Sequence, residues 1–131
     1  MKFLVVDDEE DIRLLITTWL KRKGYDYITA VNGDDCITKL TKDIDIILLD
    51  IIMPGLKAKD VIDGIKKKNP NVRVIYLTSV KPFNVTQEQE KKGLVPVIEP
   101  PIIGYIEKPL DEKTFFSRID DALKMKKFLK K

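Results

Sequence analysis

Four short apolar segments are followed by side chains that could together bind a metal ion and a phosphoryl group. The segments and the residues that follow them are 3–6 with Asp7 and Asp8, 46–49 with Asp50, 72–77 with Thr78, and 104–107 with Lys108. If these segments are parallel strands, their carboxyl ends open at one edge of a sheet, where α/β proteins bind their ligands.

Three carboxylates at one edge would repel one another. At a few ångströms and an effective dielectric near 20, each like-charge pair costs about 3–4 kcal/mol. A divalent cation would offset this repulsion, and an all-oxygen ligand set suits octahedral Mg²⁺ better than metals that prefer nitrogen or sulfur. The Lys108 ammonium and the Thr78 hydroxyl would then serve a second anion, and a phosphoryl group fits both.

Each of these residues, taken singly, also has an ordinary structural explanation. Asp50 could cap a strand or start a turn, Lys108 could be a surface lysine, and Thr78 could be a hydroxyl at the end of a strand. Tyr105 could be an edge-strand aromatic packed on its neighbours. The site interpretation is favoured because all of these residues fall at the same expected edge.

The composition is that of one soluble globular domain over residues 1–131. The chain is 44% hydrophobic and 34% charged, which allows a core without disulfides or structural metals. The apolar run at 3–6 is too short for a signal peptide or a membrane span. Histidine is absent from the sequence, which excludes histidine catalysis, histidine–metal clusters and a phosphohistidine donor within this chain.

The single cysteine fits a cytoplasmic protein, and the net charge is mild. Cys36 has no partner for an internal disulfide, which fits a reducing compartment, and its neighbours Ile37 and Leu40 indicate a core thiol. The net charge is +3, and much of the excess lies in the lysine-rich tail 124–131. Such a tail could contact nucleic acid or lipid. It also suits the dipole at a helix carboxyl end, so we expect neither nucleic acid nor membrane binding.

Apolar periodicity predicts strands that alternate with helices. We expect strands at 3–6, 25–31, 44–49, 72–77 and 104–107, and helices at 12–20, 33–40, around 61–65, and about 111–129. Asp111 is the expected N-cap of the last helix, and the apolar residues near the carboxyl end of this helix suggest that it overhangs the domain.

The strand compositions also predict their order. The first, third and fourth strands are the most apolar and should be interior, whereas the second and fifth are mixed and should form the edges. A flavodoxin-like, doubly wound, five-stranded parallel sheet in the order 2-1-3-4-5 meets both requirements.

The chain resembles the receiver domain of response regulators, of the CheY type, over nearly its whole length. The matching motifs are Val6-Asp7-Asp8-Glu9, Asn32-Gly33, Asp50-Ile51-Ile52-Met53-Pro54-Gly55, Leu77-Thr78 and Tyr105-Ile106-Glu107-Lys108-Pro109. Each motif is weak alone, but all occur in order and each lies at an expected strand end.

The resemblance implies a metal site and a phosphoacceptor. Asp50 would take a phosphoryl group from a phosphohistidine of a sensor histidine kinase or phosphotransfer protein. Asp8 would bind Mg²⁺ directly, Asp7 through water, and the backbone carbonyl of Ile52 would complete the protein ligands.

The resemblance also implies a switch. Lys108 would pair with the phosphoryl oxygens, and a cis bond before Pro109 would aim it. Thr78 would move to hydrogen-bond the phosphate, and Tyr105 would follow it inward as the switch aromatic. The change is that of a two-state element biased by local charge. The chain would promote only its own phosphorylation and dephosphorylation, and would not act as an enzyme on other substrates.

The resemblance implies that two further side chains overhang the phosphoryl group, and in this chain both are apolar. Ile52 stands two residues after Asp50, and Val80 two residues after Thr78. Neither side chain can orient an attacking water, so we predict slow self-dephosphorylation.

The sequence departs from the family pattern between the fourth and fifth strands. Thr78 and Lys108 are separated by 30 positions, several more than receivers usually need. Residues 85–92 have capping signals but no apolar face, and 94–103 contain three prolines. A displaced fourth helix is one interpretation, and an ordinary insertion over the sheet edge is the other. In the family, the face formed by the fourth helix, the fifth strand and the last helix binds downstream proteins and forms homodimers.

Three other functions remain as alternatives. A haloacid-dehalogenase-type phosphatase needs an acid two residues after its nucleophile, where this chain has Ile52. A flavodoxin-like flavin protein needs a phosphate loop after the first strand, where the acidic run at 7–10 would repel phosphate. A degenerate receiver that acts only as a phosphorylation-independent interaction module is the third alternative.

Overall fold

Five parallel strands form a single sheet in the order β2-β1-β3-β4-β5. The computed structural model describes residues 1–51, 57–78 and 100–129, without the side chains of 125–129. The strands are β1 (Lys2–Val6), β2 (Asp26–Ala30), β3 (Ile46–Asp50), β4 (Arg73–Thr78) and β5 (Ile102–Glu107). The order confirms the prediction that the most apolar strands are interior.

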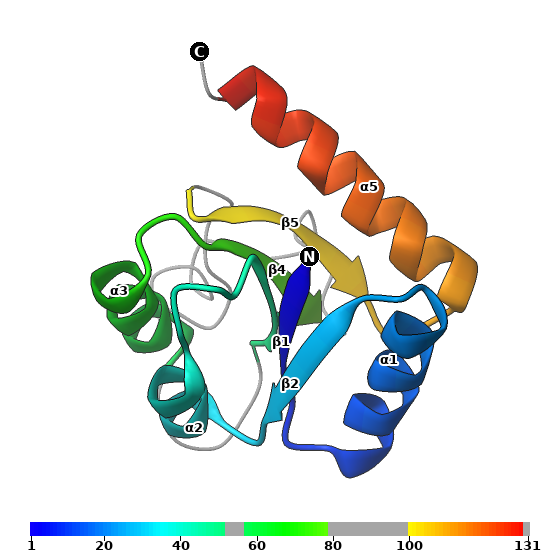
Figure 1. Cartoon of the computed structure of the whole chain (residues 1–131), viewed down its shortest axis with the longest axis horizontal. Helices are drawn as coiled ribbons and strands as arrows, with labels where there is room; N and C mark the ends of the chain where they lie inside the picture. Colours follow the sequence, from blue (N-terminus) through cyan, green and yellow to red (C-terminus); the bar gives the residue numbers. More distant parts are fainter. Residues whose placement is uncertain (52–56, 79–99, 130–131) are drawn as a thin grey trace, which may run out of the picture.

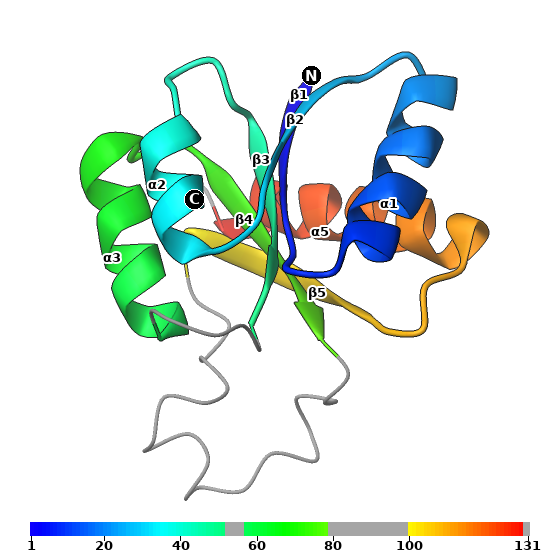
Figure 2. The ribbon, with the colours of Figure 1, turned by 90° about the horizontal axis from the view of Figure 1, so that it is seen from below.

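Helices cover both faces of the sheet (Figures 1 and 2). They are α1 (Glu10–Arg22), α2 (Gly33–Lys39), α3 (Ala58–Lys68) and α5 (Glu112–Leu129). Helices α2 and α3 lie on one face, and α1 and α5 lie on the other. The helix considered at 85–92 lies outside the described residues. Among the helices described, none has an apolar stretch of the length that a lipid bilayer requires.

Alternating side chains of the central strands pack into two separate apolar cores, one on each face of the sheet. Ile47 and Leu49 of β3 pack toward α2 and α3, whereas Ile46 and Leu48 pack toward α1 and α5. Every residue of β3 is buried, as a strand covered on both faces must be. Cys36 belongs to the first of these cores and is fully buried, which confirms it as a core thiol.

Local signals end and begin the helices where the sequence predicts. Gly24 has a φ of +80° just after α1, a backbone conformation that glycine adopts without strain. The Asn32 side chain accepts a hydrogen bond from the backbone N–H of Asp35 at the start of α2 (2.8 Å). The Asp111 carboxylate accepts one from the backbone N–H of Thr114 at the start of α5 (3.0 Å).

Strand β5 begins two residues before the predicted position, at Ile102 rather than Gly104. Ile102 pairs with Val74, and the register then shifts before Gly104 pairs with Ile75. Ile102 and Ile103 are both buried in the cores. Burial on the two faces therefore extends the strand beyond the glycine that marked its predicted start.

Helices α2 and α3 approach each other at Gly64. A Cβ atom at this position would lie 2.8 Å from Cδ1 of Ile37. The glycine, which weakens the intrinsic helix propensity of α3, thus makes room for Ile37 between the two helices.

Candidate metal and phosphoryl site

Three aspartates converge at the carboxyl edge of the sheet. Oxygen atoms of Asp7, Asp8 and Asp50 lie within 4.8 Å of one another. Val6 and Leu49 are register partners in the neighbouring strands β1 and β3, so the acids that follow them emerge side by side. Asp7 and Asp50 are 0% and 5% exposed, whereas Asp8 is exposed. The sheet register therefore forces two buried carboxylates and one exposed carboxylate into one place.

Lys108 supplies the positive charge that these acids face. Its Nζ lies 2.9 Å from Oδ2 of Asp7 and 3.3 Å from Oδ2 of Asp50. The backbone N–H of Lys108 donates to the carbonyl of Thr78 (2.8 Å), which fixes the lysine beside the end of β4. The Lys108–Pro109 peptide bond is cis, as the resemblance to receivers implies.

The environment of Lys108 keeps its ammonium charged. Burial lowers the pKa of Lys108, but the hydrogen bond to Asp7 and the charges of Asp50 and Asp7 outweigh burial and hold the pKa above its ordinary value. At neutral pH the site therefore contains a fixed cation that can face a second anion.

Glu9 and Arg13, for which the sequence predicted no role, both contact residues of the site. The carboxylate of Glu9 lies 3.6 Å from Nζ of Lys108, and its backbone N–H donates to Oδ1 of Asp7 (2.9 Å). Nη1 of Arg13 donates to the backbone carbonyl of Asp7 (2.7 Å). One sequence feature could have revealed these two residues. They are four positions apart, a spacing that places both side chains on one side of the first turn of α1.

Thr78 and Tyr105 lie on neighbouring strands, but Tyr105 pairs with Tyr76, two positions before Thr78, and the two residues differ in exposure. Thr78 is the last residue of β4 and is 2% exposed. Tyr105 is partly buried, one strand further out on β5. The guanidinium carbon of Arg118, from α5, lies 5.3 Å from the centre of the Tyr105 ring, in the range of a cation–π contact. Ile52 and Val80 lie outside the described residues.

The donor set of the three aspartates fits magnesium. It consists of carboxylate oxygens within 4.8 Å of one another, without the sulfur or nitrogen ligands that zinc and copper prefer. Lys108 contacts two of these acids and leaves Asp8 exposed, so the cluster keeps an open side toward solvent.

Comparisons with known sequences point to one family. The sequence model of the response regulator receiver domain matches residues 3–120. Response regulator SaeR of Staphylococcus aureus is 32% identical over 126 residues, which are 95% of this chain and 52% of that protein. The chain thus spans about half the length of the curated relatives it matches.

Solved structures agree with the sequence comparison. A response regulator receiver domain protein from Clostridium thermocellum is 29% identical, with a TM-score of 0.70 and coverage of 98% of both chains. The response regulator TrrA of Thermotoga maritima, solved in complex with Mg²⁺ and BeF, is 27% identical. Its TM-score is 0.71, and the match covers 92% of this chain and 97% of TrrA.

Proposed function

Because the chain belongs to the response regulator receiver domain family, we propose that Asp50 accepts a phosphoryl group from a phosphohistidine of a partner protein. The observation that carries this proposal is the convergence of Asp50 with Asp7, Asp8 and Lys108 at one edge of the sheet. Each of these residues stands at the position that the family pattern gives to the same chemistry.

The proposed step is an in-line transfer to a carboxylate. An oxygen of Asp50 forms a bond to phosphorus while the bond between phosphorus and the imidazole nitrogen of the donor breaks. The electron pair of the broken bond stays on the imidazole, so no redox partner is required. Asp50 is 5% exposed, so the surrounding residues hold its carboxylate in place. A carboxylate that is already oriented loses little further entropy when it reacts with the donor.

The neighbouring side chains would stabilise the transferred group. The Lys108 ammonium, now 3.3 Å from Asp50, would pair with phosphoryl oxygens, and the Thr78 hydroxyl would donate a hydrogen bond to one of them. Mg²⁺ held by Asp7, Asp8, Asp50 and the carbonyl of Ile52 would supply charge neutralisation at the phosphoryl oxygens. The Mg²⁺ complex of the related protein TrrA supports this assignment.

We further propose that Thr78 and Tyr105 transmit phosphorylation to a docking face. Thr78 would move toward the phosphoryl group, and the partly buried Tyr105 ring would move into the space behind it. This movement would alter the cation–π contact between Arg118 and the Tyr105 ring. The switch predicts that Mg²⁺ with beryllofluoride changes the side-chain NMR signals of Tyr105 in wild type and leaves them unchanged in Asp50→Asn.

The partners follow from the same assignment. A sensor histidine kinase or phosphotransfer protein in the cytoplasm would supply the phosphoryl group, and a downstream protein would bind the face that includes β5 and α5. This face could also form a homodimer. The fold gives no reason to expect direct nucleic acid binding, and the chain would have no catalytic role beyond its own phosphorylation and dephosphorylation.

Labelling with radioactive acetyl phosphate and Mg²⁺ tests the proposal. Wild type and the control Asp34→Asn, an exposed acid of α2, should take up label, whereas Asp50→Asn and wild type in EDTA should not. A wild type that remains unlabelled and shows no beryllofluoride response would establish the phosphorylation-independent interaction module instead.

The rate of label loss tests the apolar neighbours of the phosphoryl group. The resemblance to receivers implies that the side chains of Ile52 and Val80 flank the phosphoryl group, and neither can orient a water, so we expect the phosphorylated protein to decay over minutes or longer. Decay within a few seconds in Mg²⁺ would contradict this prediction.

A further inference from the structure

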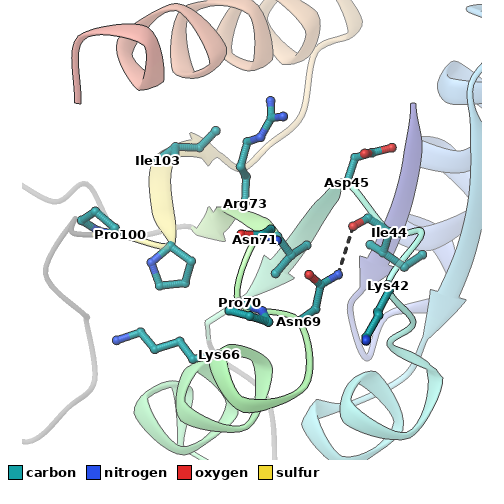
Figure 3. A pocket seen from close by; sticks show the side chains of 12 residues that line it. Lys42, Ile44, Asp45, Lys66, Asn69, Pro70, Asn71, Arg73, Pro100 and Ile103 are labelled. Carbon is teal, nitrogen blue, oxygen red and sulfur yellow. Dashed lines mark hydrogen bonds between the residues drawn. The ribbon is translucent and has the colours of Figure 1, made fainter. Parts of the chain in front are cut away.

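A cavity of about 730 Å³ lies at the amino edge of the sheet, opposite the acidic edge. Its walls come from the residues that precede β3, the end of α3, the connection from α3 to the start of β4, and the residues around the start of β5 (Figure 3). Its volume is in the range of small-molecule binding sites. Nothing in the proposed phosphoryl chemistry uses this cavity.

Three cations border the cavity, and each comes from a different segment. Lys42 precedes β3, Lys66 lies in the last turn of α3, and Arg73 begins β4; Figure 3 shows them on different sides of the opening. Within the part of the chain that the structure describes, none of the three forms an ion pair. The cavity therefore has a surplus of positive charge.

The lining residues also include one carboxylate, Asp45, which already accepts a hydrogen bond from the chain. Its Oδ2 accepts a hydrogen bond from the backbone N–H of Lys2 (2.8 Å). In Figure 3 Asp45 lies at the opposite side of the cavity from Lys66. It offsets one of the three positive charges and leaves the side near Lys66 cationic.

Arg73 has a buried donor without an acceptor. Its Nε is buried, and no hydrogen-bond partner for it occurs within residues 1–51, 57–78 and 100–124. A guanidinium group offers several donors in one plane and binds phosphate oxygens well. The buried Nε is closed to a ligand in the open cavity, so Arg73 contributes to the cavity through the positive charge of its guanidinium rather than through this donor.

Much of the remaining wall is apolar. The rings of Pro70, Pro100 and Pro101 line the cavity together with Ile103, and proline loses no side-chain freedom when a ligand packs against it. The wall near β3 is held by Asn69, whose amide donates to the carbonyls of Thr41 (3.0 Å) and Ile44 (3.2 Å). The cavity thus offers a fixed surface for a flat ring beside separated cations.

We propose that this cavity binds a nucleotide, with its ring against the proline wall and its phosphate groups toward Lys66, while Lys42 and Arg73 add positive charge on the other sides of the opening. The surplus of positive charge favours an anionic ligand, and the concave shape favours a small molecule over a protein surface. The amide of Asn71, on the same wall, can hydrogen-bond the edge of a base. This inference is independent of the phosphoryl chemistry of Asp50.

Titration of the full chain with ADP and GDP in EDTA tests the proposal, with calorimetry for affinity and ¹H–¹⁵N NMR for location. Shifts should concentrate at residues 42–45, 69–73 and 100–103. Pyrophosphate, which lacks the ring, and adenosine, which lacks the anion, should each bind at least about tenfold more weakly. Asp50→Asn should bind the nucleotides as wild type does, which separates this proposal from the proposed function.

Variants separate the cavity from general charge attraction. The double variant Lys42→Gln/Lys66→Gln should weaken nucleotide binding by about tenfold or more. Lys67→Gln is the matched control, because Lys67 is exposed on the same helix turn and does not line the cavity. An equal loss of nucleotide affinity in Lys67→Gln and in the double variant, shifts elsewhere on the chain, equal binding of pyrophosphate, or no binding at millimolar nucleotide would each overturn the proposal.

Discussion

The ammonium of Lys108 lies 3.3 Å from Oδ2 of Asp50, although the two residues are 58 positions apart in the sequence. Lys108 also lies 2.9 Å from Oδ2 of Asp7. The chain thus places its own cation against two of the three acids that would hold a divalent ion, and this cation should oppose metal binding while it favours phosphate binding.

Replacement of Lys108 should therefore separate metal binding from phosphorylation. In Lys108→Met, we expect Mg²⁺ affinity to rise on the order of tenfold, because a positive charge a few ångströms from the ion is removed, while labelling by acetyl phosphate falls sharply. Calorimetric Mg²⁺ titration measures the first effect. Lys113→Met, at an exposed position of α5, should change neither. Weaker Mg²⁺ binding in Lys108→Met would show that Lys108 orders the acids rather than opposing the metal.

The cap of α5 should give a pH-dependent contribution to stability. The hydrogen bond from the Thr114 backbone N–H holds the pKa of Asp111 below its ordinary value. A lowered pKa in the folded state adds stability above the unfolded pKa, near 4, and that stability is lost as the pH falls through the folded pKa. Asp111→Asn keeps a neutral capping group, so it should be less stable than wild type at pH 7. The two should converge in urea unfolding as the pH falls below about 4. A difference that persists unchanged at low pH would contradict this account.

Gly64 and Ile37 should be energetically coupled. Gly64→Ala improves helix propensity by about 1 kcal/mol, but its new Cβ would lie 2.8 Å from Cδ1 of Ile37. We expect little net change in wild type and a gain of about 0.5–1 kcal/mol in an Ile37→Val background, where Cδ1 is absent. A double-mutant cycle by urea unfolding measures the coupling. Additive single effects would mean that Ile37 moves aside without cost.

The buried thiol of Cys36 should be unreactive in the folded protein. Burial, with a smaller contribution from the charge of Asp35, raises the pKa of Cys36 to about 12, and the side chain is 0% exposed. Ellman's reagent at about pH 8 should therefore label the native protein only as fast as the chain opens. Rapid labelling in concentrated urea is the positive control. Immediate labelling of native protein would place Cys36 in a region that opens readily.

The strand order and the acidic cluster could be predicted because they follow from patterns within short segments. The short apolar run that ends at Asp50 is typical of a buried strand, which the structure confirms, and parallel strands carry their following residues to one edge. The roles of Glu9 and Arg13 could not be predicted in this way. They depend on the turn between β1 and α1, which brings a side chain back to a backbone carbonyl.

The cavity at the amino edge of the sheet could not be predicted from the sequence either. Lys42, Lys66 and Arg73 stand in three segments without a shared motif, and each alone resembles an ordinary surface cation. The early start of β5 also depends on tertiary packing, because a register shift beside Val74 brings Ile102 into the sheet. Such features arise from the meeting of distant segments, which local periodicity does not encode.

The length of the central strands keeps the two ends of the sheet electrically separate. Strand β3 has five residues and β4 has six, so at about 3.3 Å per residue the two edges are roughly 17–20 Å apart. This exceeds the screening distance of about 8 Å at physiological ionic strength. Occupancy of one end should leave the affinity of the other unchanged unless the backbone itself moves, and any measured cooperativity between them would therefore report a mechanical change in the strand layer.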